Sequence, residues 1–229
     1  MSVAENFRAV KIQIDIARQK RTVARDEPIT LIAVTKTHGV ELIREVIDAG
    51  ATDIGENRVQ EAAEKFPALE RKVTRHLIGH LQTNKAKLAV KLFDVIQSVD
   101  SIHLAAAVDK AAASAEKIQD VFIQLNLARE PQKSGALIED LPTLINFVDG
   151  AKNLRLRGLM MIAPLIDAEE CRPLFRQMRK IFDELRPTRE AFDFLSMGMS
   201  QDFSVAIEEG ANVVRVGTAI FGQRHSTPT

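Results

Sequence analysis

Lys36 lies at a position where a lysine could act as a nucleophile. Lys36 directly follows residues 29–35, an apolar and β-branched run that begins after Pro28 and is closed by Gly39. This pattern predicts a buried strand. Desolvation at the end of such a strand lowers the pKa of a lysine, and a neutral amine can attack a carbonyl carbon to form an imine. A lysine that steps from the strand into solvent fits the same pattern, so other residues have to decide between the two interpretations.

Two segments near the end of the chain could bind an anion. Residues 195–202 follow a predicted strand and contain Ser200, which we expect to be the N-cap of the next helix. Residues 213–222 contain another strand, and Gly217 and Thr218 open a short helical turn after it. Small residues let the backbone approach a ligand, and the free N–H groups of a helix start favour an anion. The alternative is that both segments are ordinary helix caps.

Apolar strands alternate with helical segments along most of the sequence. After an amphipathic helical pattern in residues 1–25, strands are predicted at 29–35, 52–55, 74–79, 94–99, 120–127, 154–161, 192–196 and 212–216. The helices between and after them are predicted at 40–49, 57–71, 84–92, 101–116, 138–149, 167–186 and 201–209, with a helical turn from 218. This alternation implies parallel strands joined by right-handed crossovers.

Eight strand-helix units predict a closed α/β barrel, the (β/α)8 TIM barrel, with an extra N-terminal helix. We expect it to occupy residues 1–229 as a single domain. An open doubly wound sheet is the alternative fold, but no Gly-x-Gly-x-x-Gly segment follows the first strand. In such barrels the functional site lies at the C-terminal ends of the strands. The residues at these ends are Lys36, Asn57, His80, Ser98, Asn126, Met161, Ser196 and Arg215.

The barrel brings the lysine close to the two anion-binding segments. Phosphate sites of these barrels are frequently built from the loops after strands seven and eight, and strand one is a neighbour of strand eight. An imine-forming lysine beside a phosphate site predicts a phosphorylated carbonyl ligand. The candidates are pyridoxal 5'-phosphate and the sugar phosphate of an aldolase.

Composition excludes several other classes of protein. Lys and Arg number 31 and Asp and Glu number 31, so we expect no nucleic-acid partner. No apolar run is long enough for a membrane span and no signal peptide is visible, so we expect no membrane contact. The single cysteine, Cys171, excludes an internal disulfide and favours the cytoplasm. The sequence contains no tyrosine, so no tyrosine of this chain serves as an acid or base.

Several motifs together resemble the pyridoxal phosphate homeostasis protein family. They lie between about residues 30 and 224, in the same order as in the family, at 34–36, 55–61, 76–85, 133–135, 158–160, 196–200 and 215–222. The resemblance implies a barrel similar to the N-terminal domain of alanine racemase. It also implies a cofactor-binding and regulatory role, in which the protein buffers pyridoxal phosphate or delivers it to apo-enzymes that depend on it.

The resemblance assigns seven residues to the cofactor. In that assignment Lys36 forms a Schiff base with pyridoxal phosphate, Ser200, Gly217 and Thr218 hold its phosphate, Arg215 faces its pyridine nitrogen, and Asn57 and His80 line the ring pocket. We expect no metal site. His76 precedes His80 in one predicted strand and both could point inward, but further metal ligands are missing. We also expect residues 133–135 to form a mobile loop over the barrel mouth.

We expect binding rather than catalytic turnover. An arginine at the pyridine nitrogen can only donate, which leaves the ring neutral and a poor electron sink, although alanine racemase also places an arginine there. The racemase uses a tyrosine from a second domain as one of two acid/base groups, whereas this sequence has no tyrosine and we expect no second domain. A small racemase, with His38 or His80 as the second base, and a Schiff-base aldolase remain alternatives. We expect a monomer.

Overall fold

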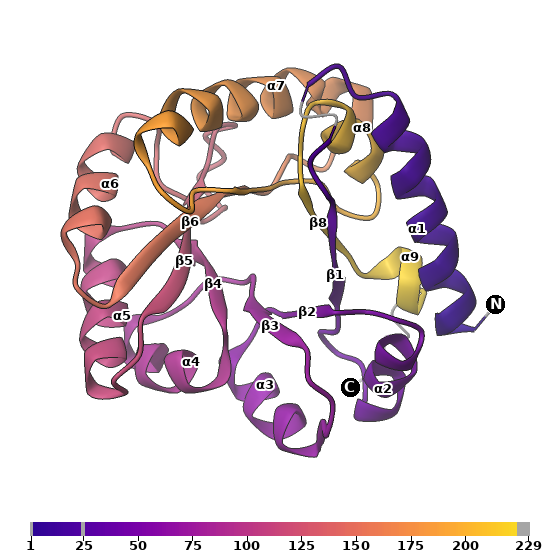
Figure 1. Cartoon of the computed structure of the whole chain (residues 1–229), viewed down its shortest axis with the longest axis horizontal. Helices are drawn as coiled ribbons and strands as arrows, with labels where there is room; N and C mark the ends of the chain where they lie inside the picture. Colours follow the sequence, from indigo (N-terminus) through magenta and orange to yellow (C-terminus); the bar gives the residue numbers. More distant parts are fainter. Residues whose placement is uncertain (1, 24–25, 224–229) are drawn as a thin grey trace.

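Short segments rich in Val, Ile and Leu form the strands of a closed barrel in the computed structural model, which describes residues 2–23 and 26–223. Each strand pairs in parallel with the next along the chain, and β8 returns to pair with β1 (Figure 1). The strands are β1 (Thr30–Val34), β2 (Asp53–Glu56), β3 (Thr74–Leu77), β4 (Val95–Val99), β5 (Gln119–Leu125), β6 (Leu154–Met161), β7 (Phe194–Ser196) and β8 (Val213–Val216).

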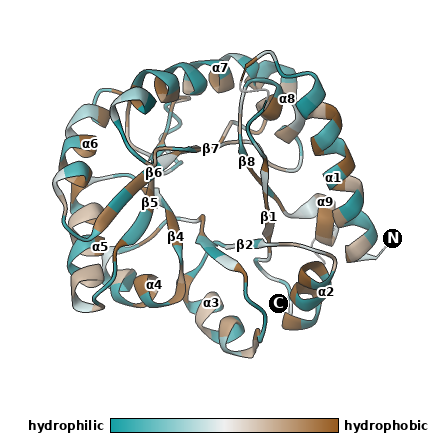
Figure 2. Ribbon diagram, in the orientation of Figure 1, coloured by the Kyte–Doolittle hydropathy of each residue, from teal (hydrophilic) through white to brown (hydrophobic). Residues whose placement is uncertain are grey.

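The helices surround the barrel as an outer ring (Figure 1). They are α1 (Val3–Gln19), α2 (Val40–Asp48), α3 (Val59–Lys65), α4 (Ala86–Leu92), α5 (Ile102–Ser114), α6 (Leu141–Gly150), α7 (Ala168–Leu185), α8 (Phe203–Glu208) and α9 (Thr218–Phe221), with 3-10 turns at Phe66–Ala68, Thr83–Lys85 and Arg186–Thr188. Hydrophilic and hydrophobic residues alternate along them, most clearly along α7 (Figure 2). This spacing gives each helix one face that can pack on the strands. The predicted (β/α)8 barrel with an added N-terminal helix is therefore confirmed.

The observed element ends differ from the predicted ones by a few residues, with two informative exceptions. The helix predicted over 57–71 ends at Lys65 and continues as a 3-10 turn, because Pro67 lacks the N–H that an α-helix would need there. The helix predicted over 201–209 begins only at Phe203. Residues 1, 24 and 25 of the first predicted helix, and residues 224–229 of the predicted domain, lie outside the described part of the chain.

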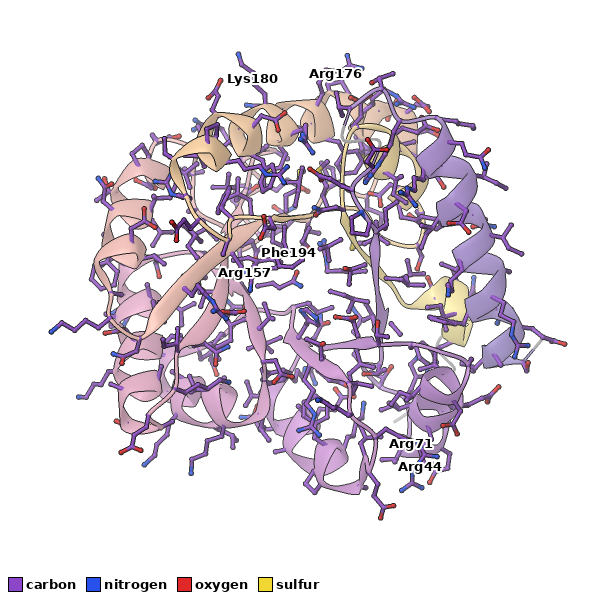
Figure 3. The ribbon with its side chains drawn as sticks, in the orientation of Figure 1. Arg44, Arg71, Arg157, Arg176, Lys180 and Phe194 are labelled. Carbon is purple, nitrogen blue, oxygen red and sulfur yellow. The ribbon has the colours of Figure 1, made fainter. Side chains whose placement is uncertain are left out.

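Two separate apolar clusters stabilise the fold. The larger one lies between the barrel wall and the helices. The smaller one fills part of the barrel interior, where Arg157 stacks over the ring of Phe194 at 4.9 Å (Figure 3). Its members are Val95, Phe122 and Met160, with Ile162 and Phe194 packed against them. Interiors of such barrels are usually filled by layers of Val, Ile and Leu. Here this apolar cluster is small, and polar side chains such as Gln97 and Ser196 are completely buried as well.

The N-terminal helix packs on the last part of the barrel. α1 lies beside α8 and α9 (Figure 1). The amide of Asn6 donates to the carbonyl oxygen of Ile220 in α9 at 2.9 Å. Ser2 caps α1 together with Glu5 in a reciprocal capping box. The extra helix therefore supports the short helix that follows β8. Among the described helices, none has the length and apolar character needed to cross a bilayer.

Candidate functional site

A cavity of about 400 Å³ opens at the C-terminal ends of the strands. The loops after β1, β2, β3, β6, β7 and β8 contribute to its wall. The lining residues are Val34, Lys36, Asn57, Ile78, Ile162, Pro164, Leu165, Ile166, Met199, Ser200, Gln201, Asp202, Arg215, Gly217 and Thr218. The cavity thus brings together six of the seven residues that the family resemblance assigned to a cofactor. Mostly apolar walls with a few convergent polar groups are typical of a site for a small molecule.

The backbone around Lys36 is held by the neighbouring helix α3. The ammonium of Lys65 donates to the carbonyl oxygen of Thr35 at 2.9 Å, and the carboxylate of Glu61 accepts the N–H of Thr37. Thr37 has a φ of 67°, which is costly for a β-branched residue. These two bonds bracket Lys36 and stabilise the sharp change of direction after β1. The position of Lys36 is therefore determined by these hydrogen bonds to α3 as well as by the end of the strand.

A buried carboxylate lies next to this turn. Glu56 is inaccessible to solvent, and its Oε1 accepts hydrogen bonds from Thr35 Oγ1 at 2.7 Å and Lys65 Nζ at 3.0 Å. Its Oε2 has no partner among the described residues. Burial raises the pKa of Glu56 above its ordinary value, although Thr35 and Lys65 act in the opposite direction. The group belongs to the support of β1, and it is not among the residues that line the cavity.

Ser200 links the two loops that were expected to bind an anion. Its hydroxyl accepts the N–H of Gly217 at 3.2 Å and the N–H of Ala219 at 3.4 Å. The expectation that Ser200 caps the helix after β7 is wrong, because α8 starts at Phe203 and is preceded by Asp202. Ser200 instead faces the first turn of α9. The two segments therefore form one polar corner of the cavity, as predicted, through a contact that sequence spacing does not reveal.

Arg215 supplies a buried positive charge to the cavity. Only 3% of the residue is exposed, and its guanidinium donates to Ser196 Oγ and to the carbonyl oxygen of Met161, both at 2.7 Å. Burial lowers the pKa of Arg215 to about 10, while Asp202 acts in the opposite direction. The guanidinium therefore stays protonated at neutral pH and can only donate hydrogen bonds. Burial also raises the pKa of the Asp202 carboxyl.

Asn57 and Gly79 meet closely at the edge of the cavity. The side-chain oxygen of Asn57 is buried and has no hydrogen-bond partner among the described residues. A buried polar atom without a partner is costly, and a ligand in the cavity would offer one. A Cβ at Gly79 would lie 2.3 Å from the carbonyl oxygen of Asn57, so no larger residue fits there. The glycine therefore permits the loops after β2 and β3 to approach each other.

The predicted role of His80 requires correction, whereas His76 points inward as the sequence allowed. His80 was expected to line the ring pocket, but it is exposed, bonds Ser134 through Nδ1 at 3.2 Å and is not among the lining residues. Its strand ends at Leu77, so His80 lies in the loop beyond it. His76 does point into the barrel, where it contacts Asp53 and Gln97. The described residues contain no group of three or more potential metal ligands.

The loop expected to be mobile is tied at several points. The amide of Asn126 donates to the carbonyl oxygens of Glu130 and Lys133, and the amide of Gln124 donates to that of Ser134. Lys133 also donates across the barrel mouth to the carbonyl oxygen of Ala163 at 3.0 Å. This loop is thus connected to the loop after β6, which forms part of the cavity wall.

Several lining residues were not predicted from the sequence. Pro164, Leu165 and Ile166 follow β6 and supply an apolar wall, with Leu165 82% exposed. Met199 and Asp202 lie on either side of Ser200, and the Asp202 carboxylate accepts the Met199 N–H at 2.6 Å. No motif in the sequence distinguishes these residues in advance.

The barrel and its lysine-containing cavity define a class of proteins. The chain matches the family model described as the N-terminal domain of alanine racemase over residues 11–225. Alanine racemase of Clostridium difficile has the same fold, with a TM-score of 0.69 at 16% identity over 97% of this chain and 57% of that one. The protein is therefore a barrel of the alanine racemase N-terminal type.

More similar relatives specify the family. A protein named pyridoxal phosphate homeostasis protein from Aquifex aeolicus is 43% identical over 85% of this chain and 86% of its own. The Escherichia coli K12 protein of that name is 39% identical over 97% of each chain. PipY of Synechococcus elongatus, solved with pyridoxal phosphate bound, matches with a TM-score of 0.85 at 37% identity over 96% of this chain and 100% of that one. The chain belongs to the pyridoxal phosphate homeostasis protein family.

Proposed function

We propose that this chain binds pyridoxal 5'-phosphate covalently through Lys36 and takes part in its homeostasis, by buffering the cofactor or delivering it to other proteins. The observation that carries this proposal is the composition of one cavity wall. It combines a lysine at the end of β1 with hydroxyl and backbone donors after β7 and β8. A lysine matches an aldehyde, and the donors match a phosphate.

The residues of the cavity fit the cofactor chemically. Ser200, Gly217 and Thr218 would hold the phosphate, with the N–H groups of the α9 turn directed toward the same corner. Arg215 would donate to the pyridine nitrogen, and the buried oxygen of Asn57 would gain a partner from the bound ligand. Val34 and Ile78 would contribute apolar surface to the ring. His80 does not belong to this set, because it is not among the lining residues.

Attachment of the cofactor would exchange the C=O bond of its aldehyde for a C=N bond to the lysine. Lys36 would hold the cofactor as a Schiff base, with the aldehyde oxygen leaving as water together with both protons of the neutral amine. The hydrogen bonds from α3 to Thr35 and Thr37 hold the lysine backbone during this step. The bound cofactor supplies an electron-accepting ring when it acts in catalysis. Arg215 limits that capacity, because a guanidinium holds its proton too strongly to transfer it to the ring nitrogen.

We further propose that the protein does not turn over a substrate. The sequence contains no tyrosine. Of the histidines considered as a second base, His80 is exposed in a loop and His38 stacks on Phe221 with ring centroids 4.6 Å apart. A binding role also fits the names of the relatives. We propose apo-enzymes that depend on pyridoxal phosphate as recipients, a monomeric state and a cytoplasmic location, which the single buried cysteine favours.

The proposal is tested with purified protein loaded with pyridoxal phosphate. We expect imine absorbance and, after borohydride reduction, a cofactor adduct on the peptide that contains Lys36. The Lys36→Ala variant should lose both, whereas Lys133→Ala should keep both because Lys133 lies at the barrel mouth and does not line the cavity. A reducible adduct that persists in Lys36→Ala would refute the assignment. Racemisation of an amino acid at about 1 s⁻¹ or faster would refute the absence of turnover.

A further inference from the structure

A chain of hydrogen bonds runs through the barrel interior from Arg215 in the cavity wall to Asp53 on β2. It joins five residues on five strands: Arg215 (β8), Ser196 (β7), Gln97 (β4), His76 (β3) and Asp53 (β2). The distances are 2.7 Å from Arg215 Nη1 to Ser196 Oγ, 2.7 Å from Ser196 Oγ to Gln97 Oε1, 3.0 Å from Gln97 Nε2 to His76 Nδ1, and 2.9 Å from His76 Nε2 to Asp53 Oδ1. Of these five residues, Arg215 lines the cavity.

With the Gln97 amide oxygen facing Ser196, the chemistry of the two ends fits one direction for all four bonds. Arginine has only donors and an ionised carboxylate has only acceptors. Ser196 must therefore accept from Arg215, and its single hydroxyl proton goes to the Gln97 oxygen. The Gln97 amide then donates to Nδ1 of His76, which places the imidazole proton on Nε2 and directs it at Asp53. All four bonds point the same way, from the buried cation to the carboxylate.

The chain is isolated from water along most of its length. Ser196 and Gln97 are completely buried, and His76 is 5% exposed. Hydrogen bonds in such a medium are strong, and bonds that point in one direction polarise one another. Burial of Asp53 opposes its ionisation, yet hydrogen bonds from His76 and Thr52 keep the pKa of its carboxyl below the ordinary value. The far end of the chain is therefore anionic at neutral pH.

We propose that Ser196, Gln97 and His76 are positioning residues that hold Arg215 in one orientation toward the ring nitrogen of the bound cofactor. This inference rests on the proposed function. Arg215 has five N–H groups, and its bonds to Ser196 and Met161 use two of them, so donors remain for a ligand in the cavity. The Ser196 and Met161 oxygens also oppose transfer of a proton from Arg215 to the ring, because acceptors of its N–H groups stabilise the protonated guanidinium. The chain of hydrogen bonds thereby keeps the ring nitrogen unprotonated, which suits binding of the cofactor and not catalysis.

Two variants of His76 form the matched test, since His76 is remote from the cavity wall. His76→Leu removes the acceptor for Gln97, whereas His76→Gln retains one donor and one acceptor. We expect His76→Leu to raise the Kd for pyridoxal phosphate about tenfold, the effect of weakening one hydrogen bond to a charged group. The ratio of the two absorbance bands of the bound cofactor should also change. His76→Gln should restore both quantities toward those of the wild type.

A cofactor analogue separates this effect from general damage to the fold. In the analogue, CH replaces the ring nitrogen, so Arg215 has nothing to contact there. The wild type and His76→Leu should bind the analogue with the same Kd, because the coupling between two interacting groups disappears when one is removed. Equal Kd values and spectra for the two proteins with pyridoxal phosphate itself would overturn the proposal. An equal loss of affinity for both ligands would also overturn it, since the role would then be structural.

Two further measurements make the outcome decisive. If His76→Leu does not fold, as judged by its melting temperature, Asp53→Asn replaces it: the acceptor remains but the charge is lost. We then expect a Kd about two- to threefold higher and a band shift in the same direction, and no change in either would overturn the proposal. The Lys36 adduct should form in all these variants. Its absence from the wild type would refute the proposed function rather than the role of the chain.

Discussion

Lys65 on α3 donates a hydrogen bond of 2.9 Å to the carbonyl oxygen of Thr35, the residue that precedes Lys36. The same ammonium lies 3.0 Å from Glu56 and 2.5 Å from Glu61. The Lys65 ammonium therefore contacts the end of β1, the buried carboxylate of Glu56, and the carboxylate of Glu61, which accepts the N–H of Thr37. The position of the cavity lysine depends on this arrangement, although Lys65 itself is not among the residues that line the cavity.

Replacing Lys65 should destabilise the protein. Lys65→Met leaves Glu56 buried without its cation, and breaking a buried pair in this way costs about 3–5 kcal/mol of the free energy of unfolding. Urea denaturation monitored by circular dichroism measures the change. Lys180→Met is the control, because Lys180 is 78% exposed on the outer face of α7 and lies 3.9 Å from Glu184 (Figure 3). A loss in Lys65→Met no larger than that in the control would contradict the prediction.

Glu56 should make the stability dependent on pH. Its folded-state pKa lies above the ordinary value of 4.5, so the folded protein binds a proton more tightly than the unfolded chain. Its contribution to stability is then present at low pH and is lost as the pH rises through the folded pKa. Glu56→Gln does not titrate, so its stability relative to the wild type should increase between about pH 4 and neutral pH. A difference that stays constant across urea titrations in this range would argue against a raised pKa.

Ser200 should discriminate between ligands with and without a phosphate. Ser200→Ala removes the hydroxyl that bonds the N–H groups of Gly217 and Ala219. We expect the Kd for pyridoxal phosphate to rise about tenfold and the Kd for pyridoxal to change little, because pyridoxal places no charged group in that corner. Fluorescence titration with both ligands gives the two values. An equal loss for both would show that Ser200 supports the loops without contacting the phosphate.

Gly79 should not tolerate a side chain. A Cβ there would lie 2.3 Å from the carbonyl oxygen of Asn57, which forces the loops after β2 and β3 apart. We expect Gly79→Ala to lower the free energy of unfolding by about 2–4 kcal/mol and to weaken cofactor binding. Gly150→Ala is the matched control, because Gly150 ends α6, a Cβ there would meet nothing within 4 Å, and alanine favours the helix. Equal stability of the two variants would contradict the close contact.

The order of elements could be predicted from the sequence because it depends on local patterns. Apolar runs such as 29–35 and the glycines that follow helices indicate strands and helix ends without reference to distant residues. The predicted cavity residues Lys36 and Arg215 followed from the ends of the strands. Both are indeed in the cavity wall.

Contacts between distant residues could not be predicted in this way. Ser196 and Gln97 are 99 positions apart, and no pattern in the sequence connects their side chains. Ser200 fits an N-cap by spacing, yet its partners are on α9 because the loops after β7 and β8 meet in space. The assignment of His80 to the ring pocket followed from the family resemblance and from a predicted strand that ends at residue 79, whereas β3 ends at Leu77. Such details depend on how the barrel closes and on where each strand stops.

The pairing of β1 with β8 has a consequence for biosynthesis. Leu31 on β1 lies in register with Val214 on β8, next to the strand ends that carry Lys36 and Arg215. The ribosome makes Lys36 well before the β8 side of the cavity. A chain that lacks β8 therefore carries this lysine without a complete cavity around it. Capture of a ligand in this cavity would report that β1 and β8 have joined.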